Sequence, residues 1–461
     1  MASRVYSTSA IDPSKYKILR VLPQEGTSVT FTASGGNTST FSIPINEVFN
    51  FSKSWIQYTR SIAAGGATMY HWLDKLGWTD IDRITLRPAS GVPLIDLQYV
   101  NNYTNCIFPH YVSMQTLHEQ PRGGCLAQVA IDLCTGLRET NAVVDGDGPT
   151  DYAQYMSTTD ATAATGVVAN SYINYTDIQS LEVNSAVNNI DVRRQVLPLG
   201  MLFHSLFAQN LDMPSCDQLY LTITWAPHTK FVHDGTDPDD GGIAGPVQAT
   251  TGACTATLVE LDMAIIKDQQ QKTDIIQKFK GGIEIPCDFV NAGLINTPAG
   301  AVHSLQIRPS IIHGSRLKRI LYAPFNATQT LQFAYVHGNE LDRFAELQTA
   351  TMDADQLYEK TLDMSAGDGY LRKKEALKGS AIQTMSQWLR FFMWVESWDD
   401  ESVKLDQSIV QGLPLAVGQR EYQAQWGVNA TGAVNWYYWI VGQKILKMKY
   451  NEMGAGEATL F

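Results

Sequence analysis

The stretch CDQLYLTITWAPHTKF, residues 216–231, alternates apolar and polar side chains and then breaks at a proline. Side chains of a β-strand point alternately to its two faces, so this pattern predicts a strand with one apolar face. We expect that face to pack inside a β-sandwich with Trp225 buried. Pro227 should end the strand, and Asp237–Asp240 should lie exposed in the loop beyond it. The apolar positions are Leu219, Leu221, Ile223 and Trp225.

The rest of the chain is also mostly β in character. Short strand-like segments are separated by clusters of Gly, Pro, Asn and Asp, which is typical of sandwiches. Helices are expected in only three places, at 95–117, at 199–209 and within 353–380. The strand-like segments are 28–33, 39–45, 54–62, 81–88, 257–267, 317–324 and 435–450.

The overall charge excludes one broad class of function. The 461 residues carry 34 basic and 46 acidic side chains, for a formal net charge of −12. A general duplex-DNA-binding protein would display a basic face instead. The length predicts two or three domains, and 44% hydrophobic residues are ample for their cores.

The sequence contains no run of about 20 apolar residues, so no membrane span is expected. Its first 20 residues lack the apolar segment of a secretory signal. We therefore expect the chain to fold in a reducing compartment. The six cysteines form no CxxC pair, which favours free buried thiols over a disulfide or metal framework. They are Cys106, Cys125, Cys134, Cys216, Cys254 and Cys287.

A polar, glutamine-rich segment divides the chain. We predict a linker at 269–281 between one domain at 26–268 and a second at 282–461, with an N-terminal arm at 1–25. The segments IDRITLRP (81–88) and LKRILYAP (317–324) share Arg-Ile and a final Pro, and LPL occurs at 197–199 and at 413–415. These short matches led to the hypothesis that one sandwich is duplicated.

Two regions have opposite charge. Residues 140–192 contain no Lys or Arg and seven acids, within a long loop predicted at 139–192. A loop of this length is usually a functional excursion or disordered, and the apolar residues within it favour a folded excursion. The first 20 residues contain Arg4, Lys15, Lys17 and Arg20 against Asp12 alone. Such an arm is either ordinary and flexible or faces an anionic surface of lipid or nucleic acid.

No candidate active site emerges from the motifs. His228, His233 and Asp234 could approach one ion, but zinc sites normally use three protein ligands or a tighter pair, and exposed loop histidines are favoured. The acids of Asp234–Asp240 do not fit a calcium loop, although a structural ion there stays open. Catalytic, cofactor-binding and metal residues are therefore all predicted as none, and the protein is predicted not to be an enzyme.

Aromatic residues cluster at 387–398 and in NWYYWI, 435–440. Trp436 and Tyr438 share one face of the predicted strand, and Tyr437 and Trp439 share the other. A strand that is apolar on both faces is covered on both faces. This favours two packed sandwiches or a tight oligomer over the alternative, stacking platforms for sugars.

The arrangement of these segments resembles the double jelly-roll major capsid proteins, the lineage of the adenovirus hexon and of the tailless membrane-containing phages. It is nearest to the capsid proteins of polinton-like viruses and virophages. The segments that carry the resemblance are FSIPINEVFNFSKSWIQY (41–58), IDRITLRP (81–88), LPLGMLFHSLFAQNLDMPSCDQLYLTITWAP (197–227), LVELDMAIIKD (258–268) and SRLKRILYAP (315–324).

The resemblance implies an all-β fold of two tandem eight-stranded jelly rolls with a few short helices and long loop excursions. It implies a homotrimer with a pseudo-hexagonal outline that tiles an icosahedral shell around double-stranded DNA. Partners would be neighbouring capsomers, penton and minor capsid proteins, and an internal membrane or the genome at the basic arm. No small-molecule substrate or cofactor is implied, and the location would be the virion.

Two other classes of protein stay open on the sequence. One is a β-sandwich that binds or hydrolyses carbohydrate, since paired carboxylates can lie far apart in a sequence. The other is a trimeric spike protein of a virion. Exposed coplanar aromatic rings would favour the first, and a separate head domain the second.

Overall fold

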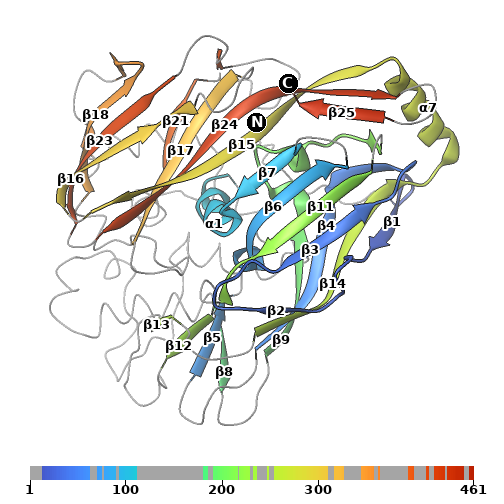
Figure 1. Cartoon of the computed structure of the whole chain (residues 1–461), viewed down its shortest axis with the longest axis horizontal. Helices are drawn as coiled ribbons and strands as arrows, with labels where there is room; N and C mark the ends of the chain where they lie inside the picture. The colour runs from blue at the N-terminus through green and yellow to red at the C-terminus, as the bar shows by residue number, and fades with distance from the viewer. Residues whose placement is uncertain are drawn as a thin grey trace.

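The structure is a computed structural model of the whole chain, and it is mostly β (Figure 1). None of the helices in its described part is long and apolar enough to cross a membrane. The described residues are 13–62, 70–74, 77–89, 93–111, 180–184, 191–215, 218–228, 232–235, 247–248, 254–298, 300–309, 316–326, 344–357, 362–363, 393–398, 412–414, 420–430, 433–450 and 456–460.

The first half of the chain forms two sheets with the strand order of a jelly roll. Counted within this half, strands 1, 8, 3 and 6 are neighbours in one sheet, and strands 2, 7, 4 and 5 are neighbours in the other. The short β2 (Val29–Phe31) continues the edge that β1 begins. The eight strands are β1 (Tyr16–Val21), β3 (Thr38–Ile43), β4 (Val48–Ile62), β6 (Ile81–Pro88), β7 (Ile95–Gln98), β9 (Asp191–Pro198), β11 (Leu219–Trp225) and β14 (Cys254–Ile266).

The second half repeats the same order, which confirms the predicted fold class of two tandem eight-stranded jelly rolls. Three short strands add to its sheets: β20 (Leu362–Asp363) beside β18, β22 (Leu413–Pro414) beside β17, and β25 (Gly456–Leu460) beside β24. The eight main strands are β15 (Ile283–Thr297), β16 (Gly300–Ile307), β17 (Arg316–Asn326), β18 (Phe344–Met352), β19 (Asp355–Gln356), β21 (Trp394–Ser397), β23 (Tyr422–Ala430) and β24 (Val434–Tyr450).

The strand order confirms that one jelly roll is duplicated. The short sequence matches, however, align strands that occupy different positions in the two jelly rolls. IDRITLRP forms β6, the fourth strand of its jelly roll, whereas LKRILYAP lies in β17, the third strand of the other. Leu413–Pro414 pairs with the first residues of β17. Its counterpart is β10 (Met213–Pro214), which pairs with the first residues of β4, and not the Leu-Pro at 197–198.

The strand at residues 219–225 occupies the centre of a core sheet. As β11 it pairs with β3 on one side and β6 on the other, and its residues alternate between buried and half-buried as predicted. Trp225 is 1% exposed. Its indole Nε1 donates to Ser39 Oγ at 2.9 Å, and the rings of Phe31 and Tyr58 meet it edge-on. Asp237–Asp240 lie outside the described residues.

The helix predictions need correction. The range 95–117 begins with strand β7, and only then does helix α1 (Val100–Tyr111) start, after Tyr99 with a positive φ of 54°. The range 199–209 is two 3-10 turns, η4 (Leu199–Met201) and η5 (Leu206–Ala208). Both turns are buried, so packing on the sheet replaces a regular helix. The described part of 353–380 contains a turn, β19 and β20.

The range predicted as a linker contains helix α7 (Gln269–Lys280). Asp268 caps it by accepting a hydrogen bond from the backbone N–H of Gln271 at 3.1 Å. Lys272 forms an ion pair with Glu47 of the first jelly roll, and Phe279 is buried. A capped helix with these contacts fixes the connection between the two jelly rolls.

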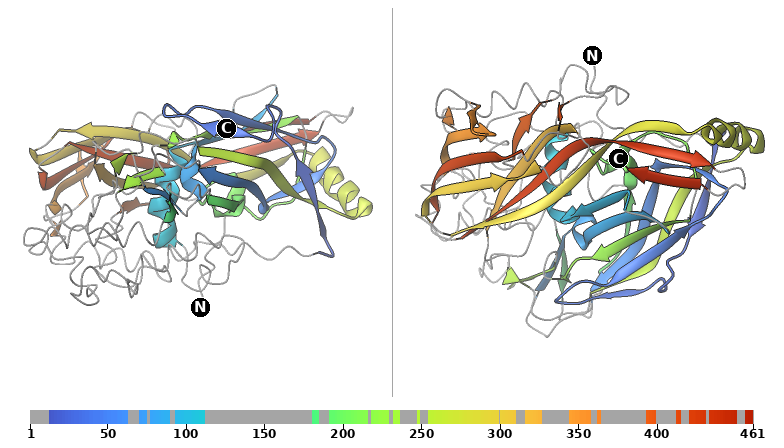
Figure 2. Two further views of the ribbon diagram at one scale, coloured as in Figure 1. Left: turned by 90° about the horizontal axis from the view of Figure 1, so that it is seen from below. Right: turned by 45° about the horizontal axis from the view of Figure 1, so that its top comes forward.

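The two jelly rolls lie side by side, and the extra elements gather at opposite ends (Figures 1 and 2). The start of β1, helix α7 and β25 lie at one end, which we call the base. At the far end of the first jelly roll, three connections between its strands pair into a small side sheet. It contains β5 (Tyr70–Asp74), β8 (Ser180–Asn184) from the predicted loop 139–192, β12 (Val232–Gly235) and β13 (Val247–Gln248). Most of that loop lies outside the described residues.

A buried ion pair lies in the first core beside the 3-10 turn η1 (Gly77–Asp80). Arg60 Nη1 and Asp80 Oδ1 are 2.7 Å apart, and both side chains are 0% exposed. The hydroxyl of Tyr58 also donates to Asp80. Burial raises the pKa of the Asp80 carboxyl although Arg60 and Tyr58 act to lower it. The pair therefore depends on both partners being present.

We predict that Asp80→Asn lowers the free energy of unfolding by about 3–5 kcal/mol, because it leaves a buried guanidinium without its counter-charge. Urea unfolding measures the loss. Glu284→Gln is the control, since it removes the exposed Lys447–Glu284 pair and should cost less than about 1 kcal/mol. Equal losses in the two variants would contradict a special role for the buried pair.

Candidate functional site

The junction between the jelly rolls is built on the aromatic run of β24. Trp436 faces the second core, where it stacks on Trp426 with ring centroids 6.0 Å apart. On the opposite face of the strand, the ring of Tyr437 lies 5.1 Å from that of Tyr99, and the ring of Trp439 lies 5.6 Å from that of Tyr103. The prediction of a strand covered on both faces is confirmed.

Burial of this run removes it as a sugar platform. Trp436 and Trp439 are fully buried and Tyr437 nearly so, whereas a platform must offer a ring face to its ligand. In the other cluster, 387–398, Trp394 is also buried, and residues 387–392 lie outside the described part. The carbohydrate hypothesis therefore loses the buried aromatic residues of these clusters, whereas Tyr438 and Trp398 are half-buried.

A polar contact crosses the same junction. Gln209 Nε2 of the first jelly roll donates to the carbonyl of Pro286 in β15 at 3.1 Å, and its Oε1 accepts from Cys287 Sγ at 3.4 Å. Burial, aided by Asp288, raises the pKa of the Cys287 thiol to about 12. A thiol held in this form is a packing group and not a nucleophile. Cys106 and Cys254 are also free and buried, as predicted, and the other cysteines lie outside the described residues.

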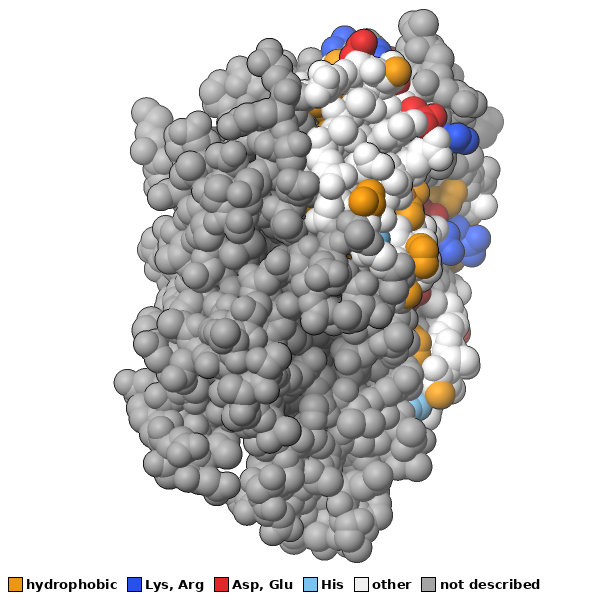
Figure 3. Space-filling model, turned by 90° about the vertical axis from the view of Figure 1, so that its left-hand side faces the viewer, with side chains coloured by type: hydrophobic (Ala, Val, Ile, Leu, Met, Phe, Trp, Pro, Cys, Tyr) orange, Lys and Arg blue, Asp and Glu red, His pale blue; other side chains and the backbone are white. Residues whose placement is uncertain are grey.

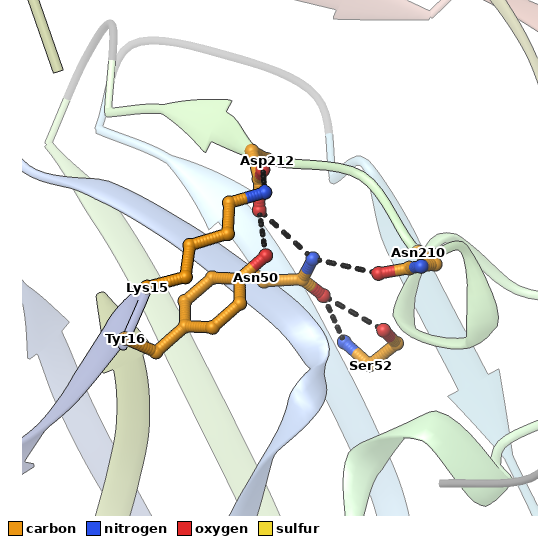
Figure 4. Close-up of polar contacts among 6 residues, drawn as sticks. All are labelled: Lys15, Tyr16, Asn50, Ser52, Asn210 and Asp212. Atoms are coloured by element: carbon orange, nitrogen blue, oxygen red, sulfur yellow. Dashed lines mark hydrogen bonds and ion pairs between the residues drawn. The ribbon is translucent and has the colours of Figure 1, made fainter. Parts of the chain in front are cut away.

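A hydrogen-bonded cluster anchors the start of β1 at the base (Figure 4). Asp212 Oδ2 is 2.6 Å from Lys15 Nζ, and Asp212 Oδ1 accepts from the Tyr16 hydroxyl at 2.6 Å and from Asn50 Nδ2 at 3.0 Å. Asn50 also binds Asn210, and its Oδ1 accepts from the backbone N–H and hydroxyl of Ser52. The cluster thus ties β1 to β4 and to the segment before β10.

The ionised forms of Asp212 and Lys15 stabilise each other in this anchor. Burial opposes ionisation of Asp212, but hydrogen bonds from Lys15, Tyr16 and Asn50 outweigh it and lower the pKa of its carboxyl. The same contact with Asp212 raises the pKa of Lys15. The pair is therefore charged on both sides across the neutral range.

The basic residues of the N-terminus are partly engaged by carboxylates of this same chain. Lys15 is engaged by Asp212, and Arg20 Nε lies 2.8 Å from Glu260 and 3.7 Å from Asp262. Two of the four basic residues thus contact this chain's own carboxylates. Lys17 is exposed on β1, and Arg4 lies outside the described residues. The strand β1 itself belongs to the first sheet, although it falls within the range 1–25 predicted as an arm.

The histidine–acid candidates do not come together in the described part. His228 is only 8% exposed, so its interpretation as an exposed loop residue is wrong. It follows β11 closely, and its backbone N–H donates to the carbonyl of Thr32, which folds it back onto the sheet. The backbone of His233 lies in β12, between β5 and β13. Among the described residues, no group of three His, Cys, Asp or Glu could hold a metal ion.

The residues that join the parts of the molecule are not marked by any pattern in the sequence. Asp212, Asn50 and Gln209 belong to no motif, and their partners lie far away in the sequence. The one available signal was Asn50, a polar residue inside the apolar segment VFNFSKSWI. A polar side chain in such a strand requires a buried partner.

On the face in Figure 3, the described residues show no concentration of one kind of side chain. Apolar groups are scattered among uncharged ones, and a few charged side chains lie at the upper edge and along the right-hand side. Single exposed apolar residues such as Val302 are normal on a protein surface. This face by itself assigns no function.

Comparisons with known proteins agree with the strand order. The sequence matches no protein-family model and no curated protein sequence. Among solved structures, the faustovirus major capsid protein is similar with a TM-score of 0.54 and 10% identity, over 93% of this chain and 90% of that one. A chain of the Sputnik virophage structure gives 0.53 and 8%, over 98% and 89%. PBCV-1 VP54 gives 0.51 and 12%, over 97% of both chains.

These similarities cover nearly the whole of each chain, so they include both jelly rolls and their relative placement. The fold of this protein is that of the double jelly-roll major capsid proteins. At 8–12% identity the agreement concerns the fold. It agrees with the family resemblance drawn from the sequence, which rested on segments 41–58, 81–88, 197–227, 258–268 and 315–324.

We predict that Asp212→Asn loosens the start of β1, because the amide keeps the shape of the carboxylate and loses its charge. Hydrogen exchange of residues 16–21 should speed up about tenfold, the effect of weakening one or two charge-assisted hydrogen bonds. Asp274→Asn is the control, since Asp274 accepts only a local bond from Gln270 in α7. Unchanged exchange in Asp212→Asn would show that the anchor does not hold the strand.

The same anchor should respond to pH. Because the pKa of Asp212 is lowered in the folded state, its contribution to stability is present above the unfolded value of about 4 and is lost as pH falls through the folded value. Because the pKa of Lys15 is raised, its contribution is lost only as pH rises above about 10.4. Exchange of residues 16–21, corrected for intrinsic rates, should therefore increase below about pH 4 and not between pH 5 and 9.

The core of the second jelly roll should weaken in mild acid. His303 Nδ1 accepts from Trp436 Nε1 at 3.2 Å, and burial lowers the pKa of the imidazole although the backbone of Pro298 acts to raise it. Because the folded state favours the neutral imidazole, the full stability is present above the unfolded pKa of about 6.5. Stability is lost as pH falls below that value, by up to about 1.4 kcal/mol per pH unit. His303→Gln keeps an acceptor without titrating, so its unfolding free energy should depend less on pH between 7.5 and 5. Identical pH slopes would contradict this.

Proposed function

We propose that this chain is a structural major capsid protein that forms pseudo-hexagonal homotrimers, and that these trimers tile an icosahedral shell around a double-stranded DNA genome. The observation that carries the proposal is the pair of jelly rolls of identical strand order, fixed side by side in one chain. The full-length likeness in fold to the faustovirus major capsid protein and PBCV-1 VP54 supports it.

Geometry explains why this fold suits a shell. A trimer of a chain with two similar units presents six similar units around its axis, so it packs with neighbours almost as a hexagon does. Closed cyclic symmetry makes such a trimer self-limiting. The aromatic junction at Tyr99, Tyr103, Tyr437 and Trp439 holds the two units of each copy in one orientation. A fixed angle between units is what a regular lattice requires.

The two ends of the molecule fit different sides of a shell. The side sheet collects connections of the first jelly roll, including β8 from the long acidic loop, and we assign this end to the outside. The base, with the start of β1, α7 and β25, we assign to the inside (Figure 1). Minor capsid proteins, and a membrane or the genome beneath the shell, would then meet the base, and penton proteins would meet the trimers at the vertices.

A role in assembly needs no chemistry from the chain. We propose that it acts in the virion without catalysing a reaction. The polar groups described at the junction and at the base hold strands and helices together, so they have a structural role, as expected for a shell protein.

We predict that the purified chain forms particles of about three times its 51.0 kDa mass, or larger shells. Mass photometry at low micromolar concentration measures this, and electron microscopy would show the hexagonal outline. A stable monomer under these conditions would overturn the proposed function.

Deleting residues 1–12 should leave the trimer intact and impair assembly of shells or contacts with their lining, because the deletion ends before β1. A deletion of residues 1–21 is the matched comparison. It also removes β1, which pairs with β14 from Tyr16 to Val21, and should destabilise the first jelly roll. Loss of the trimer after deletion of residues 1–12 would refute the proposal that these residues act in shell assembly and not in trimer formation.

A further inference from the structure

A pocket of about 160 Å³ lies where the two jelly rolls meet at their sheet edges. One wall is formed by residues 93–97 around β7 together with Ser205. The other is formed by residues 289–291 of β15 together with Lys444 of β24. Because β7 and β15 are both edge strands, this pocket belongs to neither core. A group bound there would contact both halves of the chain.

Part of the wall is apolar, and the rest is polar. Leu94, Ile95, Leu97 and Val290 are buried residues that line it, and the ring of Phe289 adds a further apolar surface. Such a wall favours the hydrocarbon part of a ligand, because bound carbon is removed from water. The volume accommodates a few carbon atoms and one polar group, and not a whole drug-sized molecule.

The charges at the pocket do not balance. Asp96 is already held by two bonds from Arg83, Nε to Oδ1 and Nη2 to Oδ2, each 2.6 Å. Lys444 Nζ lies 4.9 Å from the centroid of the Phe289 ring, and in the described part of the chain it has no ion pair. Burial lowers the pKa of Lys444, which reflects the cost of holding this cation away from water without a counter-charge. One positive charge thus remains at the pocket for a ligand to meet.

One further polar group can assist an anion. Asn291 lines the pocket, and its side chain forms no hydrogen bond with the other described residues. The hydroxyl of Ser205 is not available to an anion, because it donates to the carbonyl of Leu202 at 2.5 Å. An amide N–H₂ beside an ammonium is a suitable donor set for a carboxylate, whose two oxygens accept several hydrogen bonds.

We propose that this pocket binds a carboxylate carried on a short apolar stem, with Lys444 as its counter-ion and the leucine-, valine- and phenylalanine-lined wall holding the stem. Two sources have this chemistry, the free C-terminal residue of a peptide and a free short-chain acid. The ligand would bridge β7 and β15, so binding would also stiffen the junction between the jelly rolls. The proposal concerns the single chain and does not depend on its assembly into a shell.

Titration of the full-length protein with three probes tests the chemistry. The probe 4-methylpentanoate should bind saturably at about millimolar concentration, as expected for so few heavy atoms. Acetate, which lacks the stem, and 4-methylpentan-1-ol, which lacks the charge, should each bind at least about tenfold more weakly. Isothermal calorimetry or ligand-observed NMR measures the three affinities. Equal binding of the acid and the alcohol, or no saturable binding of the acid, would overturn the proposal.

Variants test the assigned lysine. Lys444→Met should weaken binding of 4-methylpentanoate about tenfold or more, whereas Lys444→Arg, which keeps the charge, should retain most of it. Lys447→Met on the same strand is the matched control and should bind as the parent does, since Lys447 pairs with Glu284 at the surface. Thermal unfolding of each variant checks that it is folded. Undiminished binding by a folded Lys444→Met would refute the assignment.

A further pair of probes separates the two sources. N-acetyl-alanyl-leucine with a free carboxylate should bind about tenfold more tightly than 4-methylpentanoate if the pocket receives a peptide terminus, and its C-terminal amide should not. If the pocket serves a free acid, 4-methylpentanoate should bind at least as well as the peptide. Equal and saturable binding by the peptide and its amide would contradict both sources, because binding would then not depend on the carboxylate.

Discussion

Strand β24 belongs to two hydrophobic regions at once, and the arrangement of the whole molecule depends on it. Trp436 fills the core of the second jelly roll, while Tyr437 and Trp439 turn to the first. Each large side chain so buried contributes roughly 1.5–3 kcal/mol relative to an exposed one. A strand with one polar face would leave the two jelly rolls as separate bodies on a tether. Covering both faces makes them one unit with a fixed angle.

The polar groups act around this apolar junction, and each has a defined partner. Gln209 crosses it to reach β15, Lys272 fastens α7 to the first jelly roll, and Asp212 holds the start of β1. These contacts lie between segments far apart in the sequence and at places where the chain passes from one unit to the next. They hold the base together and fix the second jelly roll against the first.

Much of the fold was predictable, because alternation is a local property of a strand. Residues 219–225 alternate apolar and polar side chains, residues 436–439 are apolar on both faces, and both segments are strands with the predicted burial. Predictions failed where tertiary contacts override local preference. Residues 95–98 read as the start of a helix, but pairing with β6 makes them a strand. Residues 199–209 lie against the sheet as two short turns, and at Gly200 the sheet approaches so closely that a Cβ would meet the backbone carbonyl of Ser52.

By itself, the sequence determined the class of the protein: all-β, divided near residues 267–281, with a two-faced strand close to its end and no catalytic motif. It did so because strand periodicity and composition are written in neighbouring residues. Only the tertiary structure decided the identical order of strands in both halves, the anchor at Asp212 and the unbalanced charge of Lys444. Each of these depends on which distant segments meet, as when Asp212 binds a side chain 196 positions away. Local pattern carries no information about that pairing, because packing of the complete chain selects it.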